Sequence, residues 1–260
     1  NIKITFNISS GVLHIGSYAF YNCSSITGQL VLNELLSIGS YTFYNCTGFT
    51  GQLILPSKLT AINQSAFSKC TGFTSISFGN SLQRINDSAF WGCTNVSGIL
   101  IIPDSVNYIG SYAFFNCSRF EGLYQLPTNL RTIGEGAFMN CSCFSSLEIL
   151  NEMIEIKESA FYGCSGLKGS LTIPDSVISI NSYSFYNCSG YDGTLKLSAS
   201  LCTIRNNSFS FTNFSQIYYE GIKEPNCEGD IGFKESQLIY ITNKYEGTTF
   251  CKYKIINIDP

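Results

Sequence analysis

Charged side chains are scarce in this sequence: Asp, Glu, Lys and Arg make up 13% of its 260 residues, against the ~25% of an average soluble domain. The net charge is −3 and no run of Lys or Arg concentrates positive charge, so the chain lacks the electrostatic footprint of a protein that binds nucleic acid. Long hydrophobic runs are missing as well. Ile99–Ile102 has the length of a buried strand, far short of the ~18 residues of a membrane span, and we therefore predict no direct membrane insertion.

Residue types that carry catalysis are equally few. His14 is the only histidine, and no pattern in the sequence pairs it with a nucleophilic Ser or Cys. Carboxylates fall singly in expected turns, as at Asp104, Glu135 and Glu158, without the clustering that a metal ion or an acid/base pair requires. We therefore expect no enzyme, no metal site and no cofactor. The sequence also starts without a Met or a secretory signal, so we expect any targeting or anchoring segment to lie outside it.

What the sequence has instead is a repeat. The stretch Ile15-Gly-Ser-Tyr-Ala-Phe-Tyr-Asn-Cys-Ser24 returns almost unchanged at residues 38–47 and 109–118. Its central phenylalanine recurs every 23 or 24 residues, at Phe20, Phe43, Phe67, Phe90, Phe114, Phe138, Phe161, Phe185 and Phe209. A fixed period in this range is typical of a solenoid, in which each repeat is one coil stacked on the next.

Each unit begins with a short alternating run that predicts a strand, with the outer two side chains facing in and the middle one facing out. These runs are Phe6–Ile8, Leu30–Leu32, Leu53–Leu55, Ile76–Phe78, Leu100–Ile102, Tyr124–Leu126, Leu147–Ile149, Leu171–Ile173, Leu195–Leu197 and Ile217–Tyr219. A turn follows, often led by proline as in Pro103-Asp-Ser-Val106, because proline lacks a donor and ends the strand. Stacking the coils would pair these strands into a parallel sheet.

The repeated stretch is too short for a full α-helix, and we predict one or two helical turns that bury Ala19, Phe20 and Cys23. The residue before the Cys is Asn or Gly in all full copies except the one with Lys69, which indicates a left-handed backbone conformation there. Ladders of Ile, Phe and Cys would form the core. After Tyr219 the pattern fails, so we divide the chain into a solenoid over residues 1–219 and a non-repeat C-terminal cap over residues 220–260.

This unit resembles the BspA-type leucine-rich repeat, a strand Leu-x-Ile-Pro followed by Val-x-x-Ile-Gly-x-x-Ala-Phe-x-x-Cys. The copy over residues 171–188 carries the whole pattern except at two positions, where Asn181 and Ser184 replace the usual Gly and Ala. The resemblance covers residues 4–219. It implies an α/β-type repeat solenoid, a leucine-rich repeat of about nine units of 23–24 residues, with a parallel β-sheet on the concave face and short helical turns on the other side.

The resemblance also implies a role. The family is found in surface and secreted proteins of bacteria and of some parasitic protozoa, and it is associated with adhesion to host cells, matrix proteins or other microbes. It carries no shared active site. For this chain it implies a secreted or cell-surface protein that binds a protein or glycan ligand on host or microbial surfaces.

Twelve cysteines in such a chain raise the question of disulfides. Stacked coils would hold equivalent Cys side chains parallel with Cβ atoms ~4.8 Å apart, whereas a disulfide needs ~3.8 Å and convergent side chains. We therefore predict free, buried thiols at one ladder position, occupied by Cys23, Cys46, Cys70, Cys93, Cys117, Cys141, Cys164 and Cys188. Cys227 and Cys251 lie outside this ladder, in the tail, and a disulfide between them is expected.

Asn-x-Ser/Thr sequons are frequent and have two interpretations. In a secreted eukaryotic protein each is a possible glycosylation site, but Asn-Cys-Ser is also the turn chemistry of the repeat, copied with the unit. The second interpretation is favoured for most of them. The candidates that lie outside the Asn-Cys-Ser/Thr turn are Asn7, Asn63, Asn86, Asn95, Asn206 and Asn213.

Two surfaces are candidates for binding a partner. The first is the outward row of the sheet, apolar in its N-terminal half and polar in its C-terminal half, with Val31, Ile54, Ile101, Gln125, Glu148, Thr172 and Lys196 as the candidate contacts. The second flanks the buried Phe with aromatic side chains, at Tyr18, Tyr21, Tyr41, Tyr44, Trp91, Tyr112 and Phe115. For each surface the alternative is structural: β-branched residues stabilise strands, and rings from adjacent coils shield the coil edges.

The function predicted from the sequence is therefore adhesion through solenoid surfaces. The alternative is a scaffold for protein–protein interaction inside the cell, suggested by the ladder of unpaired thiols. The sequence does not name the ligand.

Overall fold

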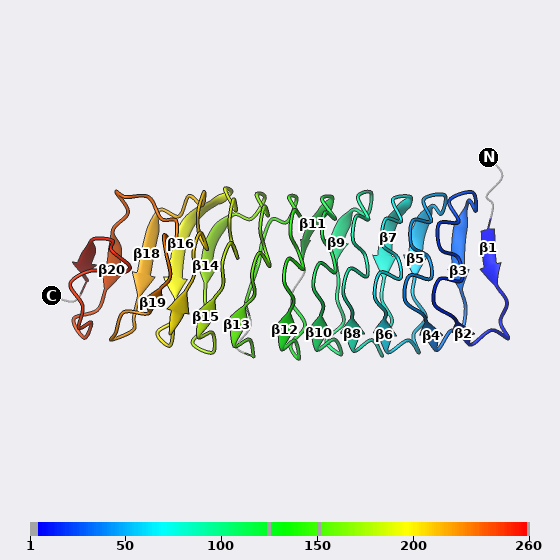
Figure 1. Ribbon diagram of the computed structural model, residues 1–260, viewed down its shortest axis with the longest axis horizontal. Helices are drawn as coiled ribbons and strands as arrows, with labels where there is room; N and C mark the ends of the chain where they lie inside the picture. The colour runs from blue at the N-terminus through cyan, green and yellow to red at the C-terminus, as the bar shows by residue number, and fades with distance from the viewer. Residues whose placement is uncertain (1–4, 124–125, 150–151, 259–260) are drawn as a thin grey trace.

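The computed structural model describes residues 5–123, 126–149 and 152–258, which form one elongated stack of about ten coils (Figure 1). The chain advances from the N-terminal coil, blue in Figure 1, to the C-terminal coil, red, without turning back on itself. The solenoid predicted from the period, and the repeat architecture that the resemblance implied, are confirmed.

The first wall of the stack is built from the alternating runs. Its strands are β1 (Thr5–Ile8), β3 (Gln29–Leu32), β5 (Gly51–Ile54), β7 (Phe73–Ser77), β9 (Gly98–Leu100), β11 (Phe120–Leu123), β14 (Gly169–Thr172), β16 (Tyr191–Leu197), β18 (Gln216–Tyr219), β20 (Ile239–Ile241) and β21 (Ile255–Asn257). They pair in parallel within the groups β1-β3-β5-β7, β9-β11 and β14-β16-β18-β20-β21. Equivalent residues face one another, as Leu171 does Leu195 and Ile54 does Ser77. The predicted register is confirmed.

One of the predicted strands is absent from this wall, and another lies mostly outside the described residues. Residues 124 and 125 of the predicted strand Tyr124–Leu126 lie outside the described residues. Leu147–Ile149 is described but forms no strand, so that prediction was wrong. The burial pattern there still alternates, with Ile149 buried and Glu148 exposed, because a side-chain ladder does not require the backbone pairing that defines a strand.

A second wall, which the sequence did not predict, consists of two-residue strands along the opposite edge of the coils (Figure 1). They are β2 (His14–Ile15), β4 (Ser37–Ile38), β6 (Ala61–Ile62), β8 (Arg84–Ile85), β10 (Tyr108–Ile109), β12 (Thr132–Ile133), β13 (Glu155–Ile156), β15 (Ser179–Ile180), β17 (Thr203–Ile204) and β19 (Asn226–Cys227). All their pairings are parallel, in the groups β2-β4, β6-β8-β10-β12 and β13-β15-β17-β19. The buried Ile of each repeat is the second residue of the strand in every coil up to β17.

The predicted helical turns were wrong: the described residues contain no helix. The stretch around each buried Phe is a compact loop that takes positive φ at two places, as at Tyr18 (60°) and Asn22 (59°) on either side of Phe20. A right-handed helix requires negative φ throughout. The amide of Phe20 instead donates to the carbonyl of Thr42 in the next coil, at 2.9 Å, so the loops are held by bonds between coils.

One of the two positive-φ positions is the residue before the Cys, where left-handed backbone was predicted. Asn45, Lys69 and Asn116 have φ between 56° and 59° there, so the prediction is confirmed. The other lies two residues before the Phe and is occupied by Tyr41 and Tyr112 among others. Tyrosine is an unusual residue for this conformation, which is why the sequence gave no signal for it.

Three of the side-chain ladders that form the core, those of Phe, Ile and Cys, run along the stack from coil to coil. Successive Phe rings from Phe20 to Phe209 stack nearly parallel, with centroids 5.2 to 5.7 Å apart. From Phe43 onward these rings are fully buried. The Ile and Cys ladders flank them on either side. Because each ring contacts the one before and the one after, the core of every coil is completed by its neighbours.

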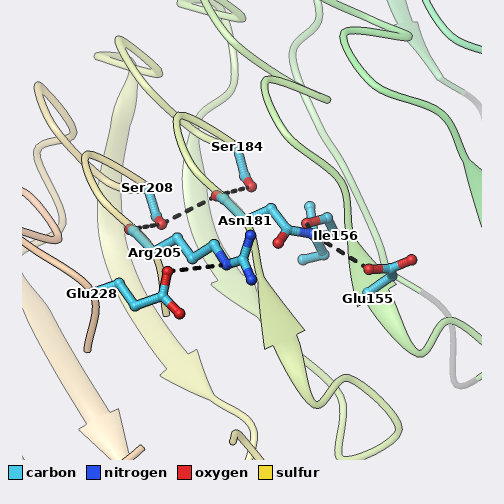
Figure 2. A network of polar contacts seen from close by, with 7 residues as sticks. All are labelled: Glu155, Ile156, Asn181, Ser184, Arg205, Ser208 and Glu228. Atoms are coloured by element: carbon cyan, nitrogen blue, oxygen red, sulfur yellow. Dashed lines mark hydrogen bonds and ion pairs between the residues drawn. The ribbon is translucent and has the colours of Figure 1, made fainter. Parts of the chain in front are cut away.

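Asn181 and Ser184, which replace the Gly and Ala of the repeat pattern, form a polar network near β15 (Figure 2). The buried hydroxyl of Ser184 donates to the carbonyls of Asn181, at 2.5 Å, and Lys157, at 3.2 Å. The side-chain amide of Asn181 donates to the carbonyl of Ile156 at 3.1 Å. Ser208 repeats the arrangement one coil later. A hydroxyl is tolerated in this core because carbonyls lie within its reach.

The tail after Tyr219 adds further coils to the same stack. β19 pairs with β17, and β20 and β21 extend the first wall beyond β18. Phe233 stacks on Phe209 with centroids 5.2 Å apart. Cys227 and Cys251 are joined by a disulfide across a sequence separation of 24 residues, with Cα atoms 5.5 Å apart.

Candidate binding surfaces

The middle residues of the alternating runs along the first wall form what we call the sheet row; Ile54 is the last residue of β5, and Ile101 directly follows β9. At its N-terminal half the row is apolar: Ile54 and Ile101 are 52% and 64% exposed, and Val31 is half-buried. Ile99 lies two residues from Ile101 on the same face and is 60% exposed, although the sequence gave it no role. Three large isoleucines thus stand open to solvent within three coils, which is unusual for side chains of this size.

The C-terminal half of the sheet row is polar. Glu148, Thr172 and Lys196 are exposed, and the Lys196 ammonium lies 2.9 Å from the Glu220 carboxylate. The candidate residue Gln125 lies outside the described residues. The row therefore changes from apolar to polar along the stack, as the sequence predicted from its composition.

The second surface, which we call the aromatic edge, follows the loops around the buried Phe. Tyr18 stacks on Tyr41 with ring centroids 5.1 Å apart, and Tyr21 stacks on Tyr44 at 5.0 Å. Within each coil the two tyrosines also touch, at 5.6 Å for Tyr18 and Tyr21. Tyr18 and Tyr21 are 57% and 42% exposed. The four rings thus form a fixed block whose outer faces and hydroxyls are presented to solvent.

A lysine continues the aromatic edge where an aromatic ring is missing. In the third repeat the position that follows the Phe is Ser68, which is buried. The Lys69 ammonium occupies the gap, 5.3 Å from the centroid of the Tyr44 ring and 4.8 Å from that of Trp91. Cation–π contacts of this kind join the two aromatic groups. Lys69 was noted in the sequence as an exception at a turn, and nothing in its spacing showed this role.

Beyond Trp91 the edge becomes less exposed. Trp91 contacts Phe115 at 5.9 Å, and Phe115 contacts Tyr112 at 6.0 Å. The Tyr112 hydroxyl donates to the Glu135 carboxylate at 2.5 Å. That hydrogen bond to a negative group, with partial burial, raises the pKa of Tyr112 to about 12. These three aromatic side chains are half-buried and are fixed by their neighbours.

The ladder thiols are free in the structure, and all but the half-buried Cys23 are buried. Each thiol from Cys46 to Cys188 donates to the carbonyl of the Phe in the preceding coil; for Cys117 and Phe90 the distance is 3.2 Å. Burial raises the pKa values of Cys93 and Cys164 to about 12. Such thiols stay protonated and unreactive at neutral pH, so the ladder is part of the core.

The candidate glycosylation sites differ in how accessible they are. Asn7, Asn95 and Asn213 are exposed, whereas Asn63, Asn86 and Asn206 are half-buried. The Asn63 amide donates to the carbonyl of Ile38 at 2.7 Å and accepts from Asn86 at 3.3 Å. The exposed Asn95 and Asn213 amides also donate to backbone carbonyls, of Thr71 and Ser189, both at 2.7 Å.

His14 does have a serine partner, contrary to the expectation from the sequence. Its Nδ1 lies 2.8 Å from the Ser37 hydroxyl, because the two residues occupy equivalent positions of β2 and β4. Among the described residues no carboxylate forms an ion pair with this imidazole. A nucleophile–base pair needs a third group that orients the base, so this contact has the geometry of a surface hydrogen bond between coils.

No helix in the described part of the chain has the length and hydropathy to cross a bilayer, and no group of three or more His, Cys, Asp or Glu side chains there could hold a metal ion.

Comparisons with known proteins bear on the fold and on the family. The family model of the BspA type leucine-rich repeat region matches the chain in six copies over residues 2–121 and 124–227. A leucine-rich repeat protein from Bacteroides ovatus superposes with a TM-score of 0.68 at 19% identity, over 97% of this chain and 71% of its own. The leucine-rich repeat protein of T. pallidum has a TM-score of 0.56 and 29% identity, over 64% of this chain and 78% of its own. No curated protein sequence matches significantly.

Proposed function

Because the chain belongs to the BspA-type leucine-rich repeat family, we propose that it is a secreted or cell-surface adhesion protein. It binds a protein or glycan partner on host or microbial surfaces through the outer walls of the solenoid. Repeat proteins of this kind use extended ladders of exposed side chains as binding surfaces.

One observation supports this proposal above the others: the apolar part of the sheet row. Ile54, Ile99 and Ile101 are each more than half exposed; Ile54 in β5 and Ile99 in β9 lie on strands that pair with the next coil, and Ile101 follows β9 directly. Large apolar side chains that gather on a rigid face favour contact with a partner. The aromatic edge is the second candidate contact, since the rings of Tyr18 and Tyr21 combine an apolar face with a polar hydroxyl.

The proposal is tested by a binding screen of the chain against matrix proteins, host cells and glycan arrays, followed by substitution on each surface. Ile54→Lys with Ile101→Lys is expected to abolish binding while the melting temperature stays unchanged, because both side chains point into solvent. Glu148→Gln with Thr172→Lys is the matched control, since it adds the same charge to the polar half of the sheet row.

The aromatic edge has its own test. Tyr21→Ser with Tyr44→Ser removes two stacked rings and leaves the sheet row intact. Loss of binding in this pair alone would move the contact to the aromatic edge. Binding that survives both pairs, or a screen without any partner, would contradict the proposed function.

An intracellular scaffold is the alternative, and the ladder of free thiols favours it. The Cys227–Cys251 disulfide favours an oxidising compartment instead. Counting thiols on the protein isolated from its own cell separates the two, together with mass-spectrometric mapping of the sequons. Ten free thiols with glycans at exposed sequons would support the exterior. Twelve free thiols without glycans would support the cytosol.

A further inference from the structure

A cleft lies on the loop side of the stack near the C-terminal coils, several coils beyond the residues named for the aromatic edge. It has a volume of about 590 Å³, within the range of about 300–1,000 Å³ that small-molecule sites occupy. Its walls come from the loops of three successive coils, and the residues important here are Asn187, Phe211, Asn213, Asp230, Gly232 and Lys234. Neither the repeat pattern nor the family comparison assigns a role to this cleft.

The loop-to-loop hydrogen bonds end at the coils that line the cleft. The residue before the Cys donates its amide to the next coil in every repeat up to Asn187, which bonds the carbonyl of Ser210 at 2.8 Å. In the described chain the series stops there. On the tail side of the cleft, the Phe233 carbonyl lies 3.1 Å from the Tyr253 hydroxyl.

Gly232 allows the tail to form the opposite wall of the cleft. Its φ is +93°, and a Cβ at this position would lie 2.5 Å from the Ser210 amide nitrogen. Any other residue would push the tail away from the loop of residues 207–213 or strain its backbone.

Phe211 is the unusual residue of this cleft. It is 64% exposed, which matches the most exposed large hydrophobic side chain among the described residues. Its φ is +61°, at the repeat position that most other coils fill with Asn or Gly. A bulky residue in this conformation is strained. Tyr186 and Phe211 form a T-shaped contact with ring centroids 5.1 Å apart, so the Phe211 ring is supported by the preceding coil.

Polar groups of both signs surround the ring. Asp230 accepts from the Gly232 amide at 2.8 Å and from the Tyr253 hydroxyl at 3.0 Å through the same oxygen, so its other oxygen is available. The Lys234 ammonium donates to the Asn213 side chain at 3.2 Å and has further N–H groups. One carboxylate and one ammonium beside an aromatic face give the cleft no net charge, which favours an uncharged ligand rich in hydroxyl groups.

We propose that this cleft is a binding site for a neutral saccharide, with Phe211 as the platform on which one pyranose ring lies. The C–H face of the sugar packs on the aromatic ring. Its hydroxyls donate to Asp230 and accept from Lys234 and Asn187, as the polar groups of a concave site fix the orientation of its ligand. The site is separate from the proposed adhesion surfaces and does not rest on them.

The test uses the whole chain expressed without N-glycosylation, since Asn213 itself stands in a sequon. A glycan array identifies sugars that bind, and saturation-transfer NMR with methyl glucoside, galactoside, mannoside and N-acetylglucosaminide measures the contact directly. Phe211→Asn places at this position the residue that Asn187 provides one coil earlier. It is expected to weaken saccharide binding at least about tenfold, while the melting temperature stays equal or rises because the backbone strain is relieved.

A second variant separates the hydrogen-bonding role from the stacking role. Asp230→Asn keeps the shape of the cleft and is expected to weaken binding without abolishing it. Tyr21→Ser, far along the stack, is the control that leaves saccharide binding unchanged. A blank array, binding of peptides alone, or saccharide binding that Phe211→Asn does not alter would each overturn the proposal. Loss of the adhesion partner in the sheet-row variants would leave it untouched.

Discussion

The repeats and the tail after Tyr219 continue the same two walls, yet different interactions hold them. In the repeats, the core of each coil is filled by equivalent residues of its neighbours: Phe114 stacks on Phe90 and on Phe138, both at 5.4 Å. Among the described repeats no disulfide joins one coil to another. In the tail the ladder residues are mostly absent. The Tyr245 hydroxyl donates to the carbonyl of Thr249 at 2.6 Å, and Cys227, which pairs with the ladder residue Ile204, forms a disulfide with Cys251.

This difference shows what a repeat contributes to stability. Where the sequence repeats, the same few apolar residues pack against both the preceding and the following coil. Each added coil therefore adds the same packing contacts, and stability grows with the number of coils. Where it does not repeat, the chain depends on individual bonds, each specific to one place. The following predictions test that contrast, from the largest expected effect to the smallest.

Alkaline pH should destabilise the repeats before the tail. A thiol in the unfolded chain ionises near pH ~8.5, whereas burial raises the pKa of Cys93 and Cys164 to about 12. The contribution of these two thiols to the free energy of unfolding is therefore complete below pH ~8.5 and is lost as the pH rises. At pH 10 the loss is about 2 kcal/mol for each of the two. In the tail, burial raises the pKa of Tyr253 to about 12, and an unfolded tyrosine ionises only near pH ~10.

Hydrogen exchange monitored by mass spectrometry between pH 8 and 10 would show this order, after correction for the intrinsic exchange rate. Peptides from the repeats are expected to lose protection before those of β20 and β21. Cys117→Ala with Cys141→Ala is the control, because removing two titrating groups should flatten the dependence on pH. A stability that does not change up to pH 10 would contradict the assignment.

Removing a ring from the Phe ladder should destabilise the repeats more than the tail. Phe114→Ala leaves a fully buried cavity between two stacked neighbours and is expected to cost about 3–5 kcal/mol. Phe233→Ala removes a ring that is stacked by Phe209 on one face, meets Tyr253 in a T-shaped contact at 5.5 Å and is 8% exposed, so its loss should be smaller. Urea unfolding followed by circular dichroism measures both. If both variants lost the same free energy of unfolding, stacking on both faces of the ring would add nothing to stability.

Removing the disulfide should act on the tail alone. Cys227→Ser with Cys251→Ser releases a loop of 24 residues, and its expected cost is about 2–4 kcal/mol. The tail has few contacts with coils other than the adjacent one. Hydrogen exchange should therefore rise in β19, β20 and β21 and stay unchanged near Phe114. Cys143→Ser, at an exposed free thiol, is the control. Uniform destabilisation of the whole chain would instead show one cooperative unit.

The features that were predicted correctly are those that recur in every repeat. The period, the strand register and the three core ladders followed from like residues at like positions. The second wall was missed because two residues such as Ser37 and Ile38 are too few to show an alternating pattern. The helical turns were predicted wrongly because Tyr18 and Tyr41 carry no sign that they adopt positive φ. The cleft at Phe211 depends on Gly232 and Asp230 of the tail, where no second copy exists with which a pattern could be compared.

The smallest effect concerns backbone conformation. Asn140 has φ +62° in the repeats, and Lys252 has φ +73° in the tail. Asn140→Ala is expected to cost about 1 kcal/mol, because alanine lacks the side-chain amide that makes the left-handed conformation tolerable to asparagine. Lys252→Gly should stabilise the tail slightly, since glycine adopts this conformation without strain. Asn140→Gly is the control for the first change and should be close to neutral. Thermal unfolding measures all three. If Asn140→Ala proved neutral while Asn140→Gly destabilised, the loops would be limited by chain entropy and not by φ, and the repeated Asn would need another explanation.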